Sequence, residues 1–400
     1  MLLSVIRRIA GPAAVLVLCA GAPSVAAEAD RPPSPAPAAS ASPAAAASPS
    51  PSPAPALQWR SIGPAVSGGR VAAVAGTDLD PALMYAGAAG GGVWRSTNGG
   101  TDWTPVFDKA GTQSIGAIAI SPRDKNDVWV GTGEPWPRND VIPGDGVYHS
   151  TDGGKNWAHL GLAQTSQIAR VLLDPRDPKR VLVAALGDPF RDSAERGVFR
   201  STDGGATWTK TLYAGAAVGA SDLAMDPKNP DVLYAGMWRF RRSAWNLTSG
   251  GDDDGIYKST DGGATWKRVT GNGLPAGTTG RIALAIAPSD AKRIYALVES
   301  KDGLLWRSDD AGASWKMTSA NTLINERPFY YSRIVVDPHD ADHLFSVSVK
   351  LAESNTGGKT WHVSGKGLHG DHHDMWIAAN GRAIVEANDG GVGLSRDGGA

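Results

Sequence analysis

Ser201-Thr-Asp-Gly-Gly-Ala-Thr-Trp208 is the stretch that decides the fold, because close copies of it recur along the chain. The final tryptophans of the six complete copies stand 46 to 58 residues apart. A period of this length is typical of architectures that repeat one supersecondary unit. The complete copies occupy residues 96–103, 150–157, 201–208, 259–266, 308–315 and 354–361, and a seventh begins at Ser395-Arg-Asp-Gly-Gly-Ala400.

Each copy has the composition of a pinned turn. The Asp at its third position can accept backbone N–H groups, and the glycine two residues later takes a positive φ at little cost. The closing Trp carries a large apolar surface and an N–H that needs a partner. We therefore expect a hairpin turn that its own side chains stabilise. Asn98 keeps this capacity in the first copy, whereas Thr356 replaces the acid in the sixth and predicts a looser turn.

Short apolar runs surround each turn, and they predict strands. Around the third copy these runs are Ile168–Leu173, Val181–Leu186, Gly197–Arg200 and Trp208–Tyr213. Four short antiparallel strands in a unit of about 50 residues are typical of a propeller blade. The sequence thus predicts an all-β fold, a β-propeller of seven four-stranded blades. Leu57–Ile62, which contains Trp59, has no blade of its own, and we expect it to supply the outer strand of the seventh blade and close the ring.

The N-terminal region predicts export. Arg7 and Arg8 precede an apolar run over 9–22, and small residues favour cleavage before Glu28. This run is too short for a membrane-spanning helix, so we expect no transmembrane span in the mature chain. The predicted organisation is a signal peptide at 1–27, a Pro/Ala/Ser-rich linker at 28–56 and the propeller at 57–400, in a periplasmic or extracellular protein.

Charge and cysteine content exclude several classes of function. The 39 basic and 40 acidic residues nearly balance and form no basic run, which argues against a nucleic-acid partner. Cys19 is the only cysteine and lies in the predicted signal peptide. We therefore expect no disulfide, thiol nucleophile or thiolate metal site in the mature chain. No cofactor is expected.

The repeated octapeptide resembles the Asp-box, or BNR repeat, of sortilin-type (Vps10) propellers, xyloglucan-active glycoside hydrolases, sialidases and a photosystem assembly factor family. Residues 59–400 resemble bacterial exported proteins described as sortilin-like or glycosyl-hydrolase-like. The segments that carry this closer resemblance are Gly131-Thr-Gly-Glu-Pro135, Ala235-Gly-Met-Trp238, His369-Gly-Asp-His-His-Asp-Met-Trp376 and Asn388-Asp-Gly-Gly391. The Asp-box specifies the fold strongly and the function weakly.

The resemblance also bears on catalysis. It implies a catalytic Asp in the first blade of xyloglucan-active enzymes, and Ala89 stands at that position here. The second acid of those enzymes belongs to a second propeller. The sialidase resemblance implies an Arg triad, of which only Arg70 has a similar early position. A hydrolase would therefore need other carboxylates at glycosidase spacing. The candidates are Glu134, Asp188, Glu386 and Asp389.

Irregular insertions between strands predict the ligand site, because loops at the channel opening carry function in such folds. The insertions are Glu134–Pro143, Asp188–Arg196 and Trp238–Gly251. Exposed aromatic rings with arginines can stack on sugars or bind a peptide carboxylate; packing against neighbouring loops is the alternative. The predicted ligand-binding residues are Trp136, Arg138, Arg239, Arg241, Trp245 and Asn246.

A cluster of histidines and acids offers a possible metal site. His369, Asp371, His372, His373 and Asp374 carry groups that ligate divalent metals. Successive side chains of a strand point to opposite faces, however, so a structural role for some of them competes with this hypothesis.

The sequence favours a non-catalytic sortilin-like binding or scaffold module for a protein, peptide or glycan ligand. A glycoside hydrolase and an assembly factor of the photosystem type are the alternatives.

Overall fold

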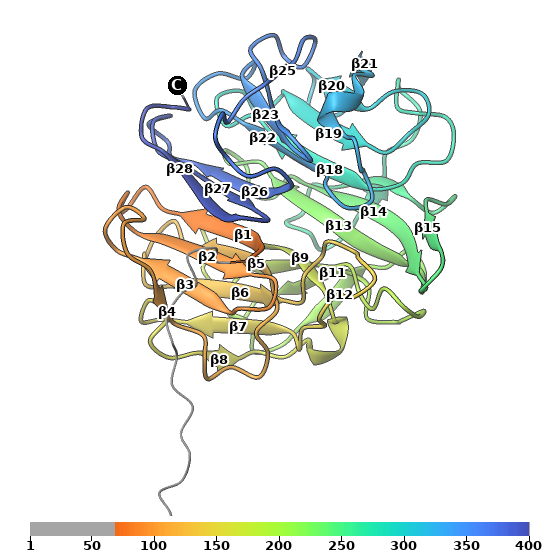
Figure 1. Cartoon of the computed structure of the whole chain (residues 1–400). Coiled ribbons are helices and arrows are strands. Elements are labelled where there is room, and N and C mark those ends of the chain that lie inside the picture. The colour runs from red at the N-terminus through yellow and green to blue at the C-terminus, as the bar shows by residue number, and fades with distance from the viewer. Residues whose placement is uncertain (1–68, 400) are drawn as a thin grey trace, which may run out of the picture. The chain divides into compact units, whose positions relative to one another are not determined.

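The computed structural model describes residues 69–399, which form seven antiparallel β-sheets arranged as the blades of a propeller (Figure 1). The predicted all-β, seven-bladed fold is confirmed. The first four blades contain β1 (Val71–Gly76), β2 (Met84–Ala88), β3 (Val93–Ser96) and β4 (Thr104–Pro105); β5 (Ile115–Ile120), β6 (Val128–Thr132), β7 (Val147–Ser150) and β8 (Ala158–His159); β9 (Ile168–Leu173), β10 (Val181–Ala185), β11 (Gly197–Ser201) and β12 (Thr209–Leu212); and β13 (Val218–Met225), β14 (Leu233–Arg242), β16 (Gly255–Ser259) and β17 (Lys267–Arg268), with β15 (Leu247–Ser249) paired to β14.

The last three blades follow the same order from the inner strand outward. The fifth blade contains β18 (Ile282–Ile286), β19 (Ile294–Val298), β20 (Leu305–Ser308) and β21 (Lys316–Ser319). The sixth contains β22 (Arg333–Val336), β23 (Leu344–Val347), β24 (Leu351–Ser354) and β25 (His362–Val363), and the seventh contains β26 (His372–Ile377), β27 (Ile384–Asn388) and β28 (Gly391–Ser395).

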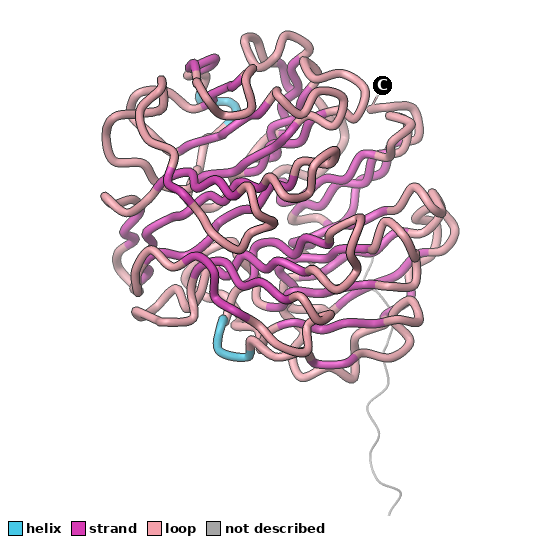
Figure 2. Tube along the Cα trace, turned by 180° about the vertical axis from the view of Figure 1, so that it is seen from behind, coloured by secondary structure: helices cyan, strands magenta, loops and turns pink. Residues whose placement is uncertain are grey.

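Helix is confined to two 3₁₀ turns within residues 69–399, η1 (Ala163–Thr165) and η2 (Thr322–Ile324), as Figure 2 shows. None of the helices in this range has the length and apolar character needed to cross a bilayer.

The first strands of successive blades line the centre of the ring. Strand β1 contacts both β5 and β26, so the first and last blades meet side by side. Glycines in the second strands allow this close packing. A Cβ at Gly87 would lie 2.4 Å from Cγ2 of Ile115 on the next inner strand. Any side chain there would push the blades apart, because the sheets are already in contact.

The repeated octapeptides form the expected turns, which we call the repeat turns. In the third blade Asp203 accepts the N–H of Thr207 at 2.9 Å, and Ser201 Oγ accepts the N–H of Gly205 at 2.8 Å. Gly204 and Gly205 have φ angles of 76° and 86°, in the region that glycine tolerates. In the sixth blade, Thr356 Oγ1 accepts the N–H of Thr360 at 2.9 Å and Ser354 Oγ accepts the N–H of Gly358 at 3.0 Å, so the substituted turn keeps both bonds.

The seventh sheet has three strands within the described residues, in the order β26-β27-β28. The segment Leu57–Ile62, predicted to complete this blade, lies outside the described residues. The predicted signal peptide and linker, 1–27 and 28–56, also lie outside them.

Candidate functional site

One end of the ring carries the long insertions. Strands alternate in direction within a blade, so the loop between its second and third strands lies at the same end as the segment that enters the next blade. The loops at 134–143 and 188–196 and the β14–β15 hairpin are therefore brought to one end. We call the centre of this end the channel mouth; it is formed by Arg70, Glu134, Tyr330, His373 and Asp389.

Trp136 fills the channel beneath the mouth. Its side chain is 1% exposed, and its indole Nε1 donates to the carbonyl oxygen of Ala72 at 3.2 Å. The Arg281 guanidinium lies 4.5 Å from the ring centroid and also donates to the carbonyl oxygen of Pro135. The guanidinium of Arg333 lies 5.4 Å from the same ring. These cation–π and hydrogen-bond contacts fix the insertion across the channel.

Buried ion pairs line the channel below Trp136. Arg170 Nε lies 2.9 Å from Asp222, and Arg333 Nε lies 3.3 Å from Asp374. Burial alone would raise the pKa of Asp222, but the charges of Arg170 and Arg333 outweigh it and the pKa falls. Asp374 also accepts the N–H of Val74 at 3.1 Å. Asp374 is therefore fully engaged in holding inner strands together.

Arg70 and Glu134 form a two-point ion pair at the mouth, with Nε 2.6 Å from Oε1 and Nη2 2.8 Å from Oε2. Glu134 is 1% exposed. Burial raises the pKa of its carboxyl, and Arg70 offsets part of that rise. The main chain of Glu134 is held by the side chain of Gln167, which donates to the carbonyl oxygen of Glu134 at 2.6 Å.

A second pair at the mouth joins His373 and Asp389, with Nε2 2.7 Å from Oδ1. Burial lowers the pKa of His373, which favours its neutral form. Burial alone would raise the pKa of Asp389, but the hydrogen bond from His373 and the nearby arginines lower it. The rings of Tyr330 and Tyr331 pack on His373, with centroids 5.6 and 5.3 Å away.

A cavity of about 370 Å³ opens beside this cluster. Its lining includes the side chains of Arg70, Arg138 and Asp140 and the backbone of Gly90 and Gly91. The Arg138 side chain is 34% exposed, and its Nη2 lies 3.2 Å from an oxygen of Asp140. The mouth thus presents two guanidinium groups to the cavity, that of Arg70 at 15% exposure and that of Arg138 at 34%.

The β14–β15 hairpin carries the remaining predicted ligand residues. Trp245 at its tip is 88% exposed, and Ser243 and Asn246 hold the turn with a 2.8 Å backbone bond. Below the tip, Arg241 pairs with Asp192 of the loop at 188–196. Arg239, nearer the core, lies 2.7 Å from Asp253. The hairpin is therefore anchored at its base and exposes an indole to solvent.

The comparisons place this arrangement among known propellers. The family model described as sortilin, neurotensin receptor 3, matches residues 91–218. The matched part of the propeller, 128 of the 400 residues, is thus similar to the sortilin family. A xyloglucanase from Paenibacillus sp. is 27% identical over 244 residues, covering 53% of this chain and 22% of the relative. Xyloglucanase Xgh74A from Acetivibrio thermocellus is 27% identical over 249 residues, covering 54% of this chain and 27% of the relative.

The chain therefore spans about a quarter of the length of these curated relatives. Two solved structures resemble the propeller in fold. An ancestral GH74 enzyme superposes with a TM-score of 0.62 at 18% identity, covering 85% of this chain and 46% of its own. YCF48 bound to a D1 peptide superposes with a TM-score of 0.55 at 14% identity, covering 86% and 99%. At these identities the structural likeness concerns the fold alone.

The four predicted catalytic acids of the propeller do not gather at one point. Glu134 and Asp389 lie at the mouth, each paired with a cationic or hydrogen-bonding partner. Asp188 lies in the loop at 188–196 with Arg191 Nε 2.6 Å away. Glu386 is 2% exposed and contacts His372 in the seventh blade. Ala89, where the resemblance implies an Asp, lines the mouth cavity with a methyl group.

The predicted metal ligands take separate partners. His369 Nδ1 contacts the carbonyl oxygen of Gly370, His372 contacts Glu386, and His373 contacts Asp389. Asp371 adopts a left-handed backbone with φ of 63°. Within residues 69–399 no group of three His, Cys, Asp or Glu side chains is placed to hold a metal ion. The metal hypothesis thus has no support in this part of the chain, because alternate strand faces separate the ligands.

Sequence reasoning missed Tyr330 of the mouth and two residues packed beside it, Tyr331 and Arg281. Tyr330 and Tyr331 pack on His373, and Arg281 holds Trp136. The run Phe329-Tyr-Tyr331 in a long connection between blades was a usable signal, because such a run in a loop needs a packing partner. Arg281 gave no signal, because a single arginine at the start of a strand is unremarkable in sequence.

Proposed function

We propose that this chain is an exported binding module that captures a carboxylate of an extended peptide or protein segment at the channel mouth. The observation that carries the proposal is the cavity of about 370 Å³ that Arg70 and Arg138 line. Arginine binds carboxylates through paired N–H groups and cannot lose its charge at physiological pH. Export rests on the N-terminal sequence pattern described above.

The cavity walls suit an extended backbone. A Cβ at Gly90 would lie 3.0 Å from Ile142, and one at Gly91 would lie 3.1 Å from Ala88. Glycine at both positions keeps the wall open and leaves its peptide groups accessible to a ligand. Arg138 is paired only with Asp140, whose side chain is 74% exposed. Such an exposed pair contributes little stability, so a ligand carboxylate can replace Asp140 at small cost.

The same geometry argues against a glycoside hydrolase whose acids are already placed for catalysis. The two acids of the mouth already have partners, since Glu134 contacts Arg70 at two points and Asp389 contacts His373. A general acid has to present its proton to the substrate oxygen. The Glu134 side chain is 1% exposed and its carboxylate faces Arg70, so it does not present a proton to a substrate in this arrangement.

One observation favours a glycoside hydrolase as the second candidate. Burial raises the pKa of Glu134, with a smaller contribution from the charge of Asp389, while the pKa of Asp389 is lowered. In glycoside hydrolases, one catalytic carboxyl has a raised pKa and serves as the acid, while its neighbour stays ionised and serves as nucleophile or base. Ligand binding that displaces Arg70 from Glu134 would be needed to free the acid.

Two measurements test these candidates with folded protein. The first is binding of a library of peptides with free or amidated C-termini. We expect free carboxylates to bind, and Arg138→Ala to weaken binding about tenfold or more. Arg123→Ala is the matched control, because Arg123 is exposed and donates to Arg176 O away from the cavity.

The second measurement is release of reducing ends from xyloglucan and other β-glucans. Equal binding of free and amidated peptides would overturn the carboxylate proposal. Sugar release that Glu134→Gln with Asp389→Asn abolishes would establish the hydrolase instead. Absence of release, from protein that binds peptide, would leave the binding module as the function.

A further inference from the structure

A cavity of about 380 Å³ opens between the fourth and fifth blades and shares no lining residue with the cavity at the mouth. Its rim is formed by Arg268 and the connection at 269–277, most of which is exposed. Asp254 also lines the cavity and is 1% exposed. The other buried lining residues are aliphatic and at most 2% exposed: Ile256, Ile282 and Val298. The cavity therefore leads from an exposed rim to a buried, aliphatic interior that contains one carboxyl group.

The hydrogen bonding of Asp254 is incomplete. Its Oδ1 accepts the N–H of Arg239 at 2.5 Å, and the N–H of Gly251 also bonds the carboxyl. Within residues 69–399 nothing donates to its buried Oδ2. A buried carboxyl oxygen without a partner costs free energy, because it has left water without gaining a hydrogen bond in the protein. The side chain therefore has one acceptor left for a ligand.

The equivalent acid of the second blade is bonded differently. Asp145 stands five residues before the serine of its repeat turn, as Asp254 does in the fourth blade. Asp145 Oδ2 accepts the hydroxyl of Tyr148 at 2.7 Å, and its Oδ1 lies 3.3 Å from the hydroxyl of Thr132. Side chains of its own blade therefore contact both oxygens of Asp145.

The fourth blade lacks both of these contacts. Strand register places Met237 where the second blade has Thr132. A thioether carries no N–H or O–H and cannot donate a hydrogen bond. Tyr257 takes the position of Tyr148, but its hydroxyl donates to the carbonyl oxygen of Asp253 at 3.4 Å. The fourth blade thus keeps the acid without the side-chain donors that satisfy it in the second blade.

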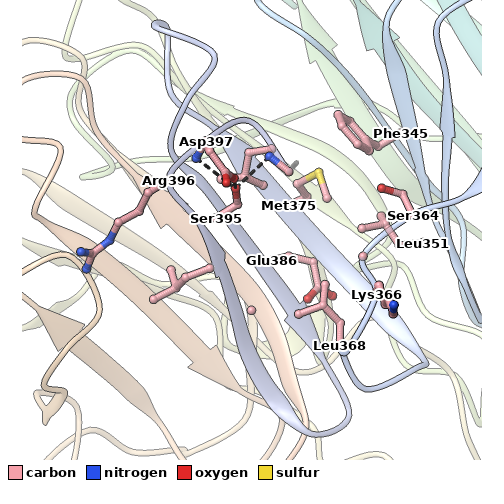
Figure 3. Close-up of a pocket in the computed structure, with 15 residues that line it drawn as sticks. Phe345, Leu351, Ser364, Lys366, Leu368, Met375, Glu386, Ser395, Arg396 and Asp397 are labelled. Atoms are coloured by element: carbon pink, nitrogen blue, oxygen red, sulfur yellow. Dashed lines mark hydrogen bonds between the residues drawn. The ribbon is translucent and has the colours of Figure 1, made fainter.

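Two other cavities contain carboxyl groups that are already paired. In the groove of about 560 Å³ between the sixth and seventh blades, Glu386 contacts His372 and accepts the side-chain amide of Asn388 at 2.8 Å (Figure 3). In the mouth cavity, Asp140 is paired with Arg138. A carboxyl group that lines a cavity and keeps a free oxygen therefore sets the site between the fourth and fifth blades apart from these two.

The two arginines beside Asp254 do not complete its bonding. Arg239 Nη2 lies 2.7 Å from an oxygen of Asp253. Arg268 lines the cavity, but its guanidinium donates to the backbone carbonyl oxygen of Asp254 rather than to the carboxyl. A carboxylate is stable in a buried site when a cation is hydrogen-bonded to it. A cationic ligand at Oδ2 would supply the partner that these arginines do not.

The walls of the cavity define the rest of the ligand. A lysine side chain carries an ammonium group on a flexible four-carbon stem, and such stems pack along apolar surface. An ammonium is also a compact donor, which suits a single free oxygen better than the planar fork of a guanidinium. The aliphatic lining consists of Ile256, Val269, Leu274, Pro275, Ile282 and Val298.

We propose that the cavity between the fourth and fifth blades binds a primary ammonium group on an aliphatic stem, with Asp254 as its acceptor. The ammonium belongs to a lysine side chain of a partner protein or to a free alkylamine, which present the same chemistry. This site is separate from the channel mouth, and the proposal does not depend on carboxylate binding there.

Proton release on binding is the first measurement, and it needs no variant. Burial raises the pKa of Asp254 to about 8, so its carboxyl is mostly neutral at about pH 6.5 and has to lose its proton to pair with an ammonium. We expect about one proton released per butylammonium bound at about pH 6.5, and almost none at about pH 9. Calorimetric titration of the full chain in buffers of different ionisation enthalpy measures this number. Binding without release at the lower pH would overturn the proposal, because the acid would then lie outside the contact.

The other charged or titratable groups around Asp254 are Asp253, Tyr257, Arg239, Arg268 and Glu299. Arginine stays charged over this pH range. Burial raises the pKa of Tyr257, which moves its titration further above the range. Asp253 is paired with Arg239, and Glu299 accepts the hydroxyl of Ser249 at 2.6 Å. Asp254→Asn should abolish the proton release, which separates Asp254 from the two other acids.

Affinity gives an independent measurement at about pH 9, where an alkylamine is still largely charged. Butylammonium should bind about tenfold or more tightly than butanol, which has the same stem without the charge. Asp254→Asn should weaken butylammonium binding about tenfold or more. Asp252→Asn is the matched control and should change the affinity less than about threefold, because Asp252 is exposed and screened by salt.

The source of the ammonium follows from a third ligand, a lysine flanked by glycines in a peptide with blocked ends. Tighter binding of this peptide than of butylammonium would support the proposal and assign the group to a partner protein. Weaker binding would support it with a free alkylamine as the ligand. Equal affinities for butanol and butylammonium, or no saturable binding of any of the three ligands, would overturn it. If Asp254→Asn gives no folded protein, proton release and the butanol comparison decide.

Discussion

Arg70 and Glu134 hold each other at two points although 64 residues separate them, with 2.6 Å from Nε to Oε1 and 2.8 Å from Nη2 to Oε2. Arg70 directly precedes β1, and Glu134 stands two positions after the end of β6. The pair therefore joins the first and second blades at the channel mouth. It also places Arg70 beside the cavity that Arg138 lines.

We predict that Arg70→Met destabilises the fold by about 3–5 kcal/mol at pH 7, because it leaves the Glu134 carboxylate buried without its cation. Arg70→Met with Glu134→Gln should recover much of that loss, since the buried charge is then removed. Urea denaturation of the three proteins measures these differences. Equal stability of the single and double variants would contradict the explanation.

A pH dependence follows from Asp254, which is 1% exposed and lines a cavity between blades four and five. Burial raises the pKa of its carboxyl to about 8, against hydrogen bonds from Arg239 and Gly251 that lower it. The folded state then binds a proton that the unfolded state releases near 3.8. This contribution is complete below pH 3.8 and is lost as the pH rises toward 8.

We therefore predict that Asp254→Asn flattens the fall in unfolding free energy between about pH 4 and pH 8. The slope at stake is roughly 1.4 kcal/mol per pH unit for one proton. Denaturation at a series of pH values measures it. Asp252→Asn is the control, because Asp252 is exposed two residues away. Parallel profiles for Asp254→Asn and the unsubstituted protein would rule out Asp254 as the origin.

The fold was predictable because each repeat turn is specified locally. Each turn contains a serine, an acid, two glycines and a tryptophan at fixed spacing. The side chains of the turn accept its own backbone N–H groups, as Ser201 and Asp203 do. Repetition then determines the blades, and the strand alternation that separates His372 from His373 was equally readable. Local requirements of this kind do not depend on knowing which distant segments meet.

The site was less predictable because burial depends on those distant segments. Trp136 and Trp245 both stand in polar insertions next to arginines, yet one is 1% and the other 88% exposed. What separates them is Arg281, which packs on Trp136 from 145 positions away in the sequence. Tyr330 and His373 likewise meet only because the ring brings their blades together. A single sequence does not encode such contacts in a local pattern.

The sixth repeat turn offers a stabilising substitution. Thr356 takes the position of the acid, and its hydroxyl accepts the N–H of Thr360 and bonds the Thr360 hydroxyl. Asp203 and Asp310, at the same position in other blades, make the same two contacts with a charged carboxylate in place of a neutral hydroxyl, and charged acceptors form stronger hydrogen bonds. Those bonds lower the pKa of both acids to about 2.

We predict that Thr356→Asp raises the midpoint of thermal unfolding at pH 7 and that the gain disappears near pH 2. The sign follows from a folded pKa below the unfolded value, which gives stability above the unfolded pKa and loses it as the pH falls. Thr356→Val, which cannot accept the N–H, should lower the midpoint. A lower midpoint for Thr356→Asp at pH 7 would show that this turn does not accept the acid geometry.

Substitution of the two loop tryptophans, Trp136 and Trp245, separates an effect on stability from an effect on ligand binding. Trp136→Ala should cost about 3–5 kcal/mol of unfolding free energy, because it empties a buried space against Arg281 and the backbone of Ala72. Trp245→Ala should change stability by about 0.5 kcal/mol at most, since the indole projects into solvent. If the β14–β15 hairpin contacts the ligand, Trp245→Ala will weaken peptide or glycan binding in a fully stable protein. Unchanged affinity for every ligand that the mouth binds would remove Trp245 from the binding surface and confine that surface to the cavity beside Arg70 and Arg138.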